Sequence, residues 1–311
     1  MPLVSIVTPS FNQGTYIRAT LESVLSQDVH DIELIVMDGG STDNTVEVLR
    51  EFSDPRLVWY SESDRGQSHA LNKGFRLSHG EYLSYLNSDD LLMPGAVRFA
   101  LEYFAVHPRC DMVYGDCQVI DGAGRQIGTS PGKPFDLAQA LRGVNPVVQP
   151  GAFWRRNVLE SVGDFDETLR YTMDYDYWLR AGVKGFQLDY VSGERSAFRV
   201  HSQSKTMAES VHFWQDREHV IDTLYASGNL PSHVLDEREH AFAYTRWLRT
   251  KRLWMLKEYV SARPLLNDHV RYGTSSRRVV AALMLIDSYL GTSLTRSFNW
   301  ILALSGRGFL V

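Results

Sequence analysis

The chain has 311 residues, enough for two ordinary domains or for one large α/β domain with an appendage, so a short peptide module is excluded. Its hydrophobic share of 44% and charged share of 22% are typical of globular proteins, and 32 basic against 37 acidic residues leave a net charge of only −5. These values exclude a disordered chain, a collagen and a strongly basic nucleic-acid-binding protein, so we expect no nucleic-acid partner.

The first hundred residues predict strands that alternate with helices. Four apolar runs are expected to be buried strands: residues 4–8, 32–37, 57–60 and 82–86. Four segments with helical spacing of apolar residues follow them in turn: 16–26, 45–52, 66–76 and 96–104. Ser41 and Thr42 are expected to cap the helix that begins at residue 45. The alternation indicates an α/β fold whose mainly parallel sheet has right-handed crossovers.

Polar side chains stand at the ends of these strands. In parallel sheets, ligands bind beyond the carboxyl ends of the strands. Thr8, Asp38, Asp64 and the pair Asp89-Asp90 all lie at or just past such ends. We therefore expect four polar clusters to meet along one rim of the sheet.

The pattern becomes less regular beyond residue 104. It predicts a strand at 112–114, then a hairpin, a helix near Val158 and a helix that opens around Asp174. Residues 122–128 superficially match a glycine-rich dinucleotide-binding loop. Such a loop needs a helix directly after it, but Pro131 and Pro134 follow instead, so a turn is predicted.

Long helical periodicity without strands begins near Met207, and we place a domain boundary between residues 1–205 and 206–311. The first part holds 19 Lys and Arg against 27 Asp and Glu, a net charge of −8, and the second holds 13 against 10, a net charge of +3. Amphipathic helices with basic faces are expected at 212–224 and 241–259, and later apolar stretches include Trp300, Ile301 and Phe309. Two roles are open for this part: peripheral contact with an anionic membrane, or packing on the first domain or on a second subunit as a homodimer.

Targeting signals are not evident. The chain begins without the basic segment and cleavage site of a secretory signal, and no apolar stretch approaches the about 18 residues that cross a bilayer. Cys110 and Cys117 fit neither a redox pair nor a zinc ribbon, so reduced structural thiols are expected. We expect a cytoplasmic location, with peripheral attachment at the inner face of the membrane left open.

Each acidic cluster has a structural and a chemical interpretation. Asp89 and Asp90 follow a hydrophobic strand and could bind a divalent metal that bridges to a diphosphate, or this loop could cap the next helix. Asp38 could accept hydrogen bonds from a nucleobase or belong to a plain turn, and Phe11 could stack on that base or lie in the core. Asp174 and Asp176 suit the first turn of a helix, but a carboxylate there could also act as a general base.

Six ordered motifs together resemble the family 2 glycosyltransferases, over roughly residues 3–205. The matching segments are 4–12, 37–43, 62–66 with 70–74, 87–90 before Pro94-Gly95, 163–167 and 174–176. The resemblance implies a GT-A fold, a Rossmann-like and mostly parallel sheet flanked by helices, here followed by a C-terminal helical region. It also implies a nucleotide-diphosphate sugar donor, most often a UDP-sugar, the cofactor Mn²⁺ or Mg²⁺, and inversion at the anomeric carbon.

The resemblance also implies roles for individual residues. Thr8, Pro9, Phe11, Asp38, Asp64 and Asp89 would bind the nucleotide; Asp89, Asp90 and His201 would hold the metal; Asp174 would be the catalytic base; and Gln149, Trp154, Arg155 and Asp176 would face the acceptor. Two positions depart from the family pattern. Asn87 stands where Asp is frequent and could coordinate a metal only through a neutral carbonyl, and Met173 stands where Glu is frequent, which removes one acidic neighbour of the base.

The expected function is that of an inverting, metal-dependent hexosyltransferase. It would move a sugar from a nucleotide-diphosphate donor to a hydroxyl of a saccharide or lipid-linked acceptor in polysaccharide or glycoconjugate biosynthesis. The alternative is a noncatalytic scaffold that binds a nucleotide sugar on the same fold, which only Asn87 and Met173 favour. A nucleotidyltransferase is a weaker rival, because residues 10–14 lack a glycine- and lysine-rich phosphate loop.

Overall fold

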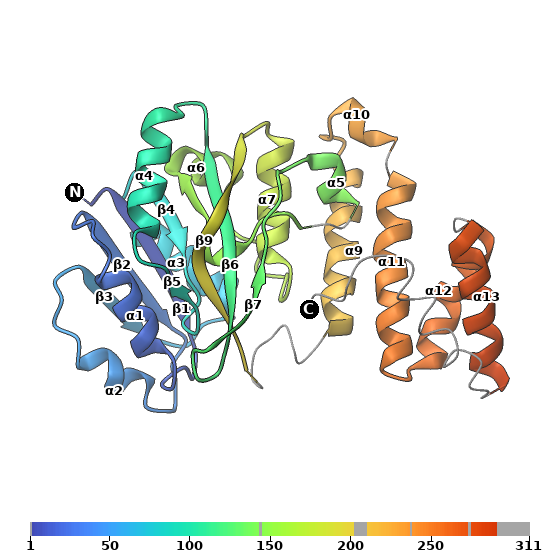
Figure 1. Cartoon of the computed structure of the whole chain (residues 1–311), viewed down its shortest axis with the longest axis horizontal. Helices are drawn as coiled ribbons and strands as arrows, with labels where there is room; N and C mark the ends of the chain where they lie inside the picture. The colour runs from blue at the N-terminus through green and yellow to red at the C-terminus, as the bar shows by residue number, and fades with distance from the viewer. Residues whose placement is uncertain (1, 143–144, 202–209, 237, 273–274, 291–311) are drawn as a thin grey trace. The chain divides into compact units, whose positions relative to one another are not determined.

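A computed structural model describes residues 2–142, 145–201, 210–236, 238–272 and 275–290. The chain divides into two compact units, which we call the sheet unit (Met1–Ala140 with Val144–Met207) and the helical unit (Leu141–Gly143 with Ala208–Val311). Figure 1 shows the strands gathered in the first unit and a row of helices in the second. Met207, Trp300, Ile301 and Phe309, named above, lie outside the described residues.

One sheet contains the described strands of the sheet unit, in the order β3-β2-β1-β4-β8-β6-β9-β5, with β7 paired to β6. The strands are β1 Val4–Ser10, β2 Ile32–Asp38, β3 Leu57–Ser61, β4 Tyr82–Tyr85, β5 Leu91–Leu92, β6 Met112–Asp121, β7 Gln126–Ser130, β8 Phe153–Arg155 and β9 Leu188–Val200. The first four pair in parallel, as do β6 and β9, while β8, β5 and β7 pair antiparallel to their neighbours. The predicted α/β fold with a mostly parallel sheet is confirmed.

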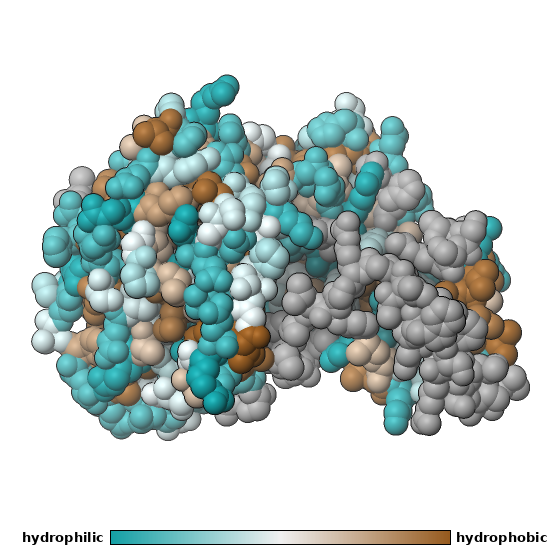
Figure 2. Space-filling view, in the orientation of Figure 1, coloured by the Kyte–Doolittle hydropathy of each residue, from teal (hydrophilic) through white to brown (hydrophobic). Residues whose placement is uncertain are grey.

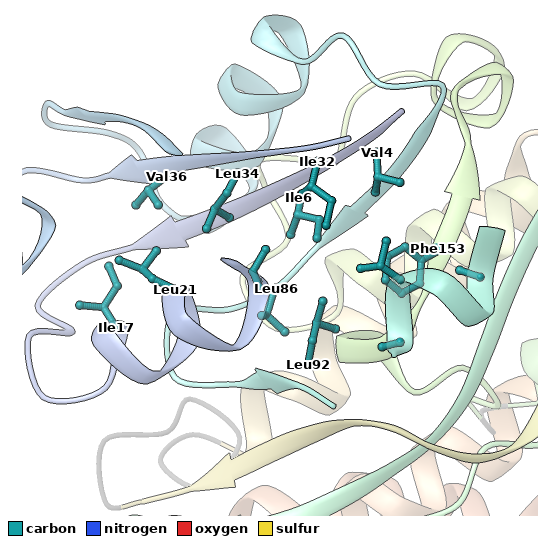
Figure 3. Packing of buried hydrophobic residues seen from close by; sticks show 14 of the residues in the cluster. Val4, Ile6, Ile17, Leu21, Ile32, Leu34, Val36, Leu86, Leu92 and Phe153 are labelled. Atoms are coloured by element: carbon teal, nitrogen blue, oxygen red, sulfur yellow. The ribbon is translucent and has the colours of Figure 1, made fainter. Parts of the chain in front are cut away.

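Helices cover both faces of the first four strands. They are α1 Ile17–Leu25, α2 Thr45–Arg50, α3 Gln67–Leu77 and α4 Ala96–Val106, followed later by α5 Leu137–Leu141, a 3₁₀ turn η1 Gln149–Gly151, α6 Arg156–Val162 and α7 Met173–Val183. On one face, Val4 and Ile6 of β1 pack with Ile17 and Leu21 of α1 in a buried aliphatic cluster (Figure 3). Because side chains alternate along a strand, Val7 points to the other face, where α3 crosses it at Gly74.

The boundaries of α1 to α4 agree closely with the predicted ones, whereas the helix predicted over residues 241–259 is interrupted at residues 256–258. One predicted cap is also wrong. The residue before α2 is Asn44, and no side chain caps it in the usual way. Asp43 instead accepts hydrogen bonds from the backbone N–H (2.9 Å) and hydroxyl (2.5 Å) of Thr45. Ser41 and Thr42 are used elsewhere, in the contacts between the loops after β1 and β2.

The helical unit has its own apolar core. Its helices are α9 Ser210–Ala226, α10 Ser232–Leu235, α11 Arg238–Met255, α12 Tyr259–Tyr272 and α13 Ser275–Leu290. The core is formed by Trp247, Leu253, Ala262, Leu266, Ala281 and Met284. The predicted C-terminal helical region is thus confirmed. Across the described ranges, every helix falls short of the length and apolarity that would let it cross a bilayer.

Candidate active site

The loops after β1 and β2 are bound to each other at the rim of the sheet. Asn12 has a left-handed backbone conformation (φ 53°). Its N–H donates to the Ser41 hydroxyl (2.7 Å), and its side-chain oxygen accepts the N–H of Thr42 (2.8 Å). Gly14 donates to Asp43 from the next part of the loop (3.0 Å). These contacts fix the backbone on both sides of Phe11 and Asp38.

Asp38 is buried and accepts hydrogen bonds within the protein. Its carboxylate receives the N–H and the hydroxyl of Ser41 (3.0 and 2.5 Å) and the hydroxyl of Ser61 at the end of β3 (2.6 Å). These contacts match the turn interpretation. The described contacts of the Asp38 carboxylate are all within the protein, so its nucleotide-binding role stays a prediction.

Phe11 is 57% exposed at the rim, which rules out the interpretation that it is a core aromatic. Thr8 and Pro9 lie beneath it, buried inside β1, and the Thr8 hydroxyl has no hydrogen-bond partner. Asp64 accepts the N–H of Gly66 (2.7 Å), and a Cβ on Gly39 would lie 2.7 Å from its other oxygen. The structure therefore brings Phe11, Asp38 and Asp64 to one rim, as their positions in the sequence predicted.

Asn87 joins three elements at the end of β4. Its side-chain oxygen accepts from Gln67 at the start of α3 (2.6 Å), and its NH₂ group donates to Asp90 (3.1 Å) and to Gln149 of η1 (3.2 Å). Gln149 in turn donates to the backbone oxygen of Tyr85 in β4 (2.8 Å). The Asn87 amide therefore forms hydrogen bonds with three neighbouring side chains. Two of these bonds use its N–H groups as donors, which an ionised Asp does not have.

Asp90 is fully buried, and the prediction that it is a metal ligand needs correction. One carboxylate oxygen accepts the backbone N–H of Arg199 (2.9 Å), and the other accepts from Asn87. Burial, and next the neighbouring carboxylate of Asp89, raise the pKa of Asp90 well above its ordinary value. With both oxygens turned into the protein, Asp90 anchors Arg199 and the loop and presents no oxygen at the rim.

Asp89 and His201 do meet. The Nε2 atom of His201 lies 3.0 Å from a carboxylate oxygen of Asp89. The guanidinium of Arg199 donates to the backbone oxygen of Asp89 (2.8 Å), and the ring of Tyr16 packs on the His201 ring with centroids 4.5 Å apart. The alternative that this loop caps α4 is not seen, because Gly95 precedes that helix and no side chain caps it.

Asp174 reaches the same rim from α7. It is partly exposed in the first turn of that helix, whose start is tied to α3 by a hydrogen bond from the Ser68 hydroxyl to the Met173 sulfur (3.0 Å). Burial first, and then the charges of Asp174 and Asp90, raise the pKa of the Tyr85 phenol well above its ordinary value. Asp174 and Asp90 therefore both lie within electrostatic range of one phenol at the end of β4.

Three of the four residues predicted to face the acceptor are placed elsewhere. The Trp154 indole is fully buried and packs edge-on against Trp178, so no sugar can stack on it. Arg155 pairs with Tyr82 at the opposite end of β4, where its guanidinium donates to the backbone oxygen of Cys110 (2.9 Å). Asp176 is buried in an ion pair with Arg180 (2.8 Å). Of the four, Gln149 alone contacts the rim, through Asn87.

Two residues in this site were not predicted. Gln67 holds Asn87, and Tyr16 packs on His201, with the guanidinium of Arg199 5.1 Å from its ring centre. Each opens or precedes a helix directly after a rim loop, which is the signal that could have identified them. The residues described contain no group of three or more His, Cys, Asp or Glu side chains around a common metal position.

Comparisons with known proteins agree on one family. The sequence model of the family described as glycosyl transferase family 2 matches residues 5–163. A chondroitin synthase of Escherichia coli is 33% identical over 189 residues, which are 60% of this chain and 27% of that protein. A glycosyltransferase of PGL/p-HBAD biosynthesis from Mycobacterium tuberculosis is 30% identical over 183 residues, 58% of this chain and 69% of the relative. The chain thus spans about a quarter of the length of the first relative and about two thirds of the second.

Solved structures show the same fold at lower sequence identity. The structure of the S. aureus TarS fragment 1–349 in complex with UDP-GlcNAc matches with a TM-score of 0.67 at 17% sequence identity. The match covers 93% of this chain and 89% of the TarS chain. A mannosyltransferase of Pyrobaculum calidifontis, in complex with GDP-Man and Mn²⁺, gives a TM-score of 0.60 at 20% identity, covering 97% of this chain and 84% of its own. Both are GT-A glycosyltransferases, so the predicted GT-A fold is confirmed.

Proposed function

The chain belongs to glycosyl transferase family 2, and from that membership we propose that it transfers a hexose from a nucleotide-diphosphate sugar to a hydroxyl group, with inversion at the anomeric carbon. The acceptor would be a saccharide or a lipid-linked saccharide in glycan biosynthesis. The observation that supports this most is the convergence of Asp89, His201 and Asp174 near the end of β4. In this proposal residues 1–205 form the catalytic domain.

The donor would bind along the rim formed by the loops after β1, β2 and β3. The exposed ring of Phe11 offers a flat apolar face for a nucleobase, and the carboxylates of Asp38 and Asp64 lie on the adjacent loops. One structural neighbour was solved with UDP-GlcNAc and another with GDP-Man. We propose a UDP-sugar, as the resemblance to the family implies.

A divalent cation fits the pair formed by Asp89 and His201. A carboxylate oxygen and an imidazole nitrogen 3.0 Å apart are donors that Mn²⁺ accepts, and Mg²⁺ would rely more on the carboxylate. When bound there, the cation would offset the negative charge that develops on the departing diphosphate. Tyr16 and Arg199 would hold the two ligands in place, since one packs on the imidazole and the other binds the backbone of Asp89.

Asp174 would act as the general base. It would take the proton of the acceptor hydroxyl while that oxygen forms a bond to the anomeric carbon. On the opposite face, the bond from that carbon to the diphosphate oxygen breaks, and the nucleoside diphosphate leaves with the electron pair. A carboxylate that is partly exposed at the rim suits this role, because an acceptor hydroxyl can reach it from solvent.

The alternative of a noncatalytic scaffold loses part of its support. Asn87, in place of Asp, favoured that alternative. Its side chain, however, donates hydrogen bonds to Asp90 and Gln149, which accounts for an amide at this position. The test is release of nucleoside diphosphate from a panel of UDP- and GDP-sugars with Mn²⁺, without acceptor. An enzyme should release nucleoside diphosphate slowly from one donor, and this release should stop when EDTA is added. A scaffold should bind a donor and release no nucleoside diphosphate.

A further inference from the structure

Apart from Arg278, the described exposed side chains of α13 are apolar. Val279, Ile286 and Tyr289 are 61%, 47% and 65% exposed, while Ala281 and Met284 on the other side join the core of the helical unit. The polar residues Asp287 and Ser288 are buried. A helix on the surface of a globular protein normally shows the reverse arrangement, with its polar side toward water.

The turn between α11 and α12 also carries exposed apolar side chains. Met255, Leu256 and Val260 are exposed there. The start of α12 lies beside the end of α13, because the Arg263 guanidinium donates to the backbone of Ser288 and lies 4.0 Å from the ring centre of Tyr289. We call Met255, Leu256, Val260, Val279, Ile286 and Tyr289 the α12–α13 surface. Hydrophobic atoms are visible over α13 in Figure 2.

The charge around this surface is positive. Residues 251–290 contain seven Lys and Arg against three Asp and Glu, a net charge of +4, while the whole chain is acidic. Among the described side chains of this segment, the exposed charges are Lys257, Arg271 and Arg278 against Glu258. Lys257 stands directly between the exposed Leu256 and the start of α12.

We propose that the α12–α13 surface binds the interface of a membrane that contains anionic lipids. Exposed aliphatic and aromatic side chains enter the boundary between head groups and acyl chains, and flanking cations attract the anionic head groups. The described helices are too short or too polar to span a bilayer, so the contact would be interfacial. A second copy of the chain is a poorer occupant, because it would bring two surfaces of the same positive charge together.

Flotation of the full-length protein with vesicles tests this without donor or acceptor, so the outcome does not depend on the proposed transfer reaction. The protein should float with vesicles of phosphatidylglycerol and phosphatidylcholine and bind vesicles of phosphatidylcholine alone much more weakly. The double variant Val279→Ser, Ile286→Ser should lose binding about tenfold or more, because two apolar anchors are removed. Lys257→Glu should weaken binding to the anionic vesicles and leave binding to vesicles of phosphatidylcholine alone unchanged.

Val106→Ser is the matched control, because Val106 is an exposed valine of α4 in the sheet unit, and it should bind as the unaltered chain does. Circular dichroism and light scattering of every variant complete the test. Equal flotation of the double variant and the unaltered chain, or no flotation with anionic vesicles, would overturn the proposal. So would a dimer of the unaltered chain that separates in the double variant, because the surface would then be a subunit interface.

Discussion

At the scale of single residues, Asn87 shows how one amide organises an acidic loop. Its oxygen accepts from Gln67, and its NH₂ group donates to Asp90 and Gln149. The two donated bonds need an amide, because an ionised carboxylate has no donor. An amide in place of Asp at this position thus suits its neighbours Asp90 and Gln149, which both accept hydrogen bonds from it. Asp90, buried and near Asp89, tolerates no further negative charge at this short distance.

Asn87→Asp should therefore destabilise the fold by about 2–4 kcal/mol, more than Asn87→Ala, because it removes two donated hydrogen bonds and adds a charge beside Asp90. The added repulsion raises the pKa of the carboxyls in the folded state. The destabilisation that these carboxyls cause should be small below their unfolded-state pKa, grow as pH rises from that value to the raised folded-state pKa, and stay constant above it. Urea unfolding at pH 4.5 and pH 8 measures this, and an equal loss at both values would argue against it.

His201→Ala should weaken the Mn²⁺-dependent binding of UDP by about tenfold or more, because one of two protein ligands is removed. Binding of UDP with EDTA present should change little. His30→Ala is the control, since His30 is exposed and lies just before β2, at the end of that strand opposite the rim. Titration calorimetry with and without Mn²⁺ separates the two contributions, and an unchanged dependence on Mn²⁺ would remove His201 from the metal site.

Burial is the property that sequence reasoning could not supply for single residues. Phe11 and Trp154 were both aromatic candidates for contact with a ligand, and the structure exposes the first and buries the second completely. Nothing in the neighbouring residues distinguishes them, because Trp154 lies in a three-residue strand whose surroundings come from α3 and α7. The prediction for Arg155 failed for the same reason, since residues distant in the sequence bind its guanidinium, whereas Asp176 pairs with Arg180 only four residues further along α7.

At the scale of elements, α3 approaches the sheet closely because Gly74 has no side chain. A Cβ at this position would lie 2.4 Å from a methyl group of Val7 in β1 and 3.2 Å from Met37 in β2. The same helix carries Gln67 and Ser68 at the site, so its distance from the sheet sets where these side chains lie. The close contact between helix and strand is therefore relevant to the site as well as to stability.

Gly74→Ala should destabilise the protein by about 1–3 kcal/mol, although alanine alone favours a helix by up to about 1 kcal/mol over glycine. Gly128→Ala is the control, because the nearest atom to its added Cβ would be 4.0 Å away on Val119. Thermal and denaturant unfolding of both variants measures the difference. Stability of Gly74→Ala equal to that of the unaltered chain would show that α3 can move outward without cost.

Most strands and helices could be predicted because they follow local apolar periodicity, and β9 shows where that signal ends. This strand of 13 residues pairs with β6 but includes Gly193, Glu194 and Arg195, and its register shifts near Gly115. Its inward and outward positions do not alternate regularly, so the sequence lacks the pattern of a strand. It nevertheless brings Arg199 to Asp89 and leads directly into His201.

At the scale of the whole molecule, the chain has two separate cores, from which we expect two unfolding steps. One core includes Val4, Leu34 and Phe153, and the other includes Trp247, Leu266 and Met284. Leu266→Ala removes a fully buried side chain from the second and should cost that unit about 2–5 kcal/mol. Calorimetry should show two transitions, of which Leu266→Ala lowers one, and a single transition that shifts as a whole would contradict this.

The central claim is that Asp174 is the base of a sugar transfer at this rim, and one variant tests it directly. Asp174→Asn keeps the shape of the side chain but cannot accept the proton, so transfer to an acceptor hydroxyl should fall by at least about a hundredfold. Binding of donor and Mn²⁺ should stay within about twofold, as in the control Asp31→Asn at an exposed position. Measured with the donor that the panel identifies, near-normal transfer by Asp174→Asn would contradict the account.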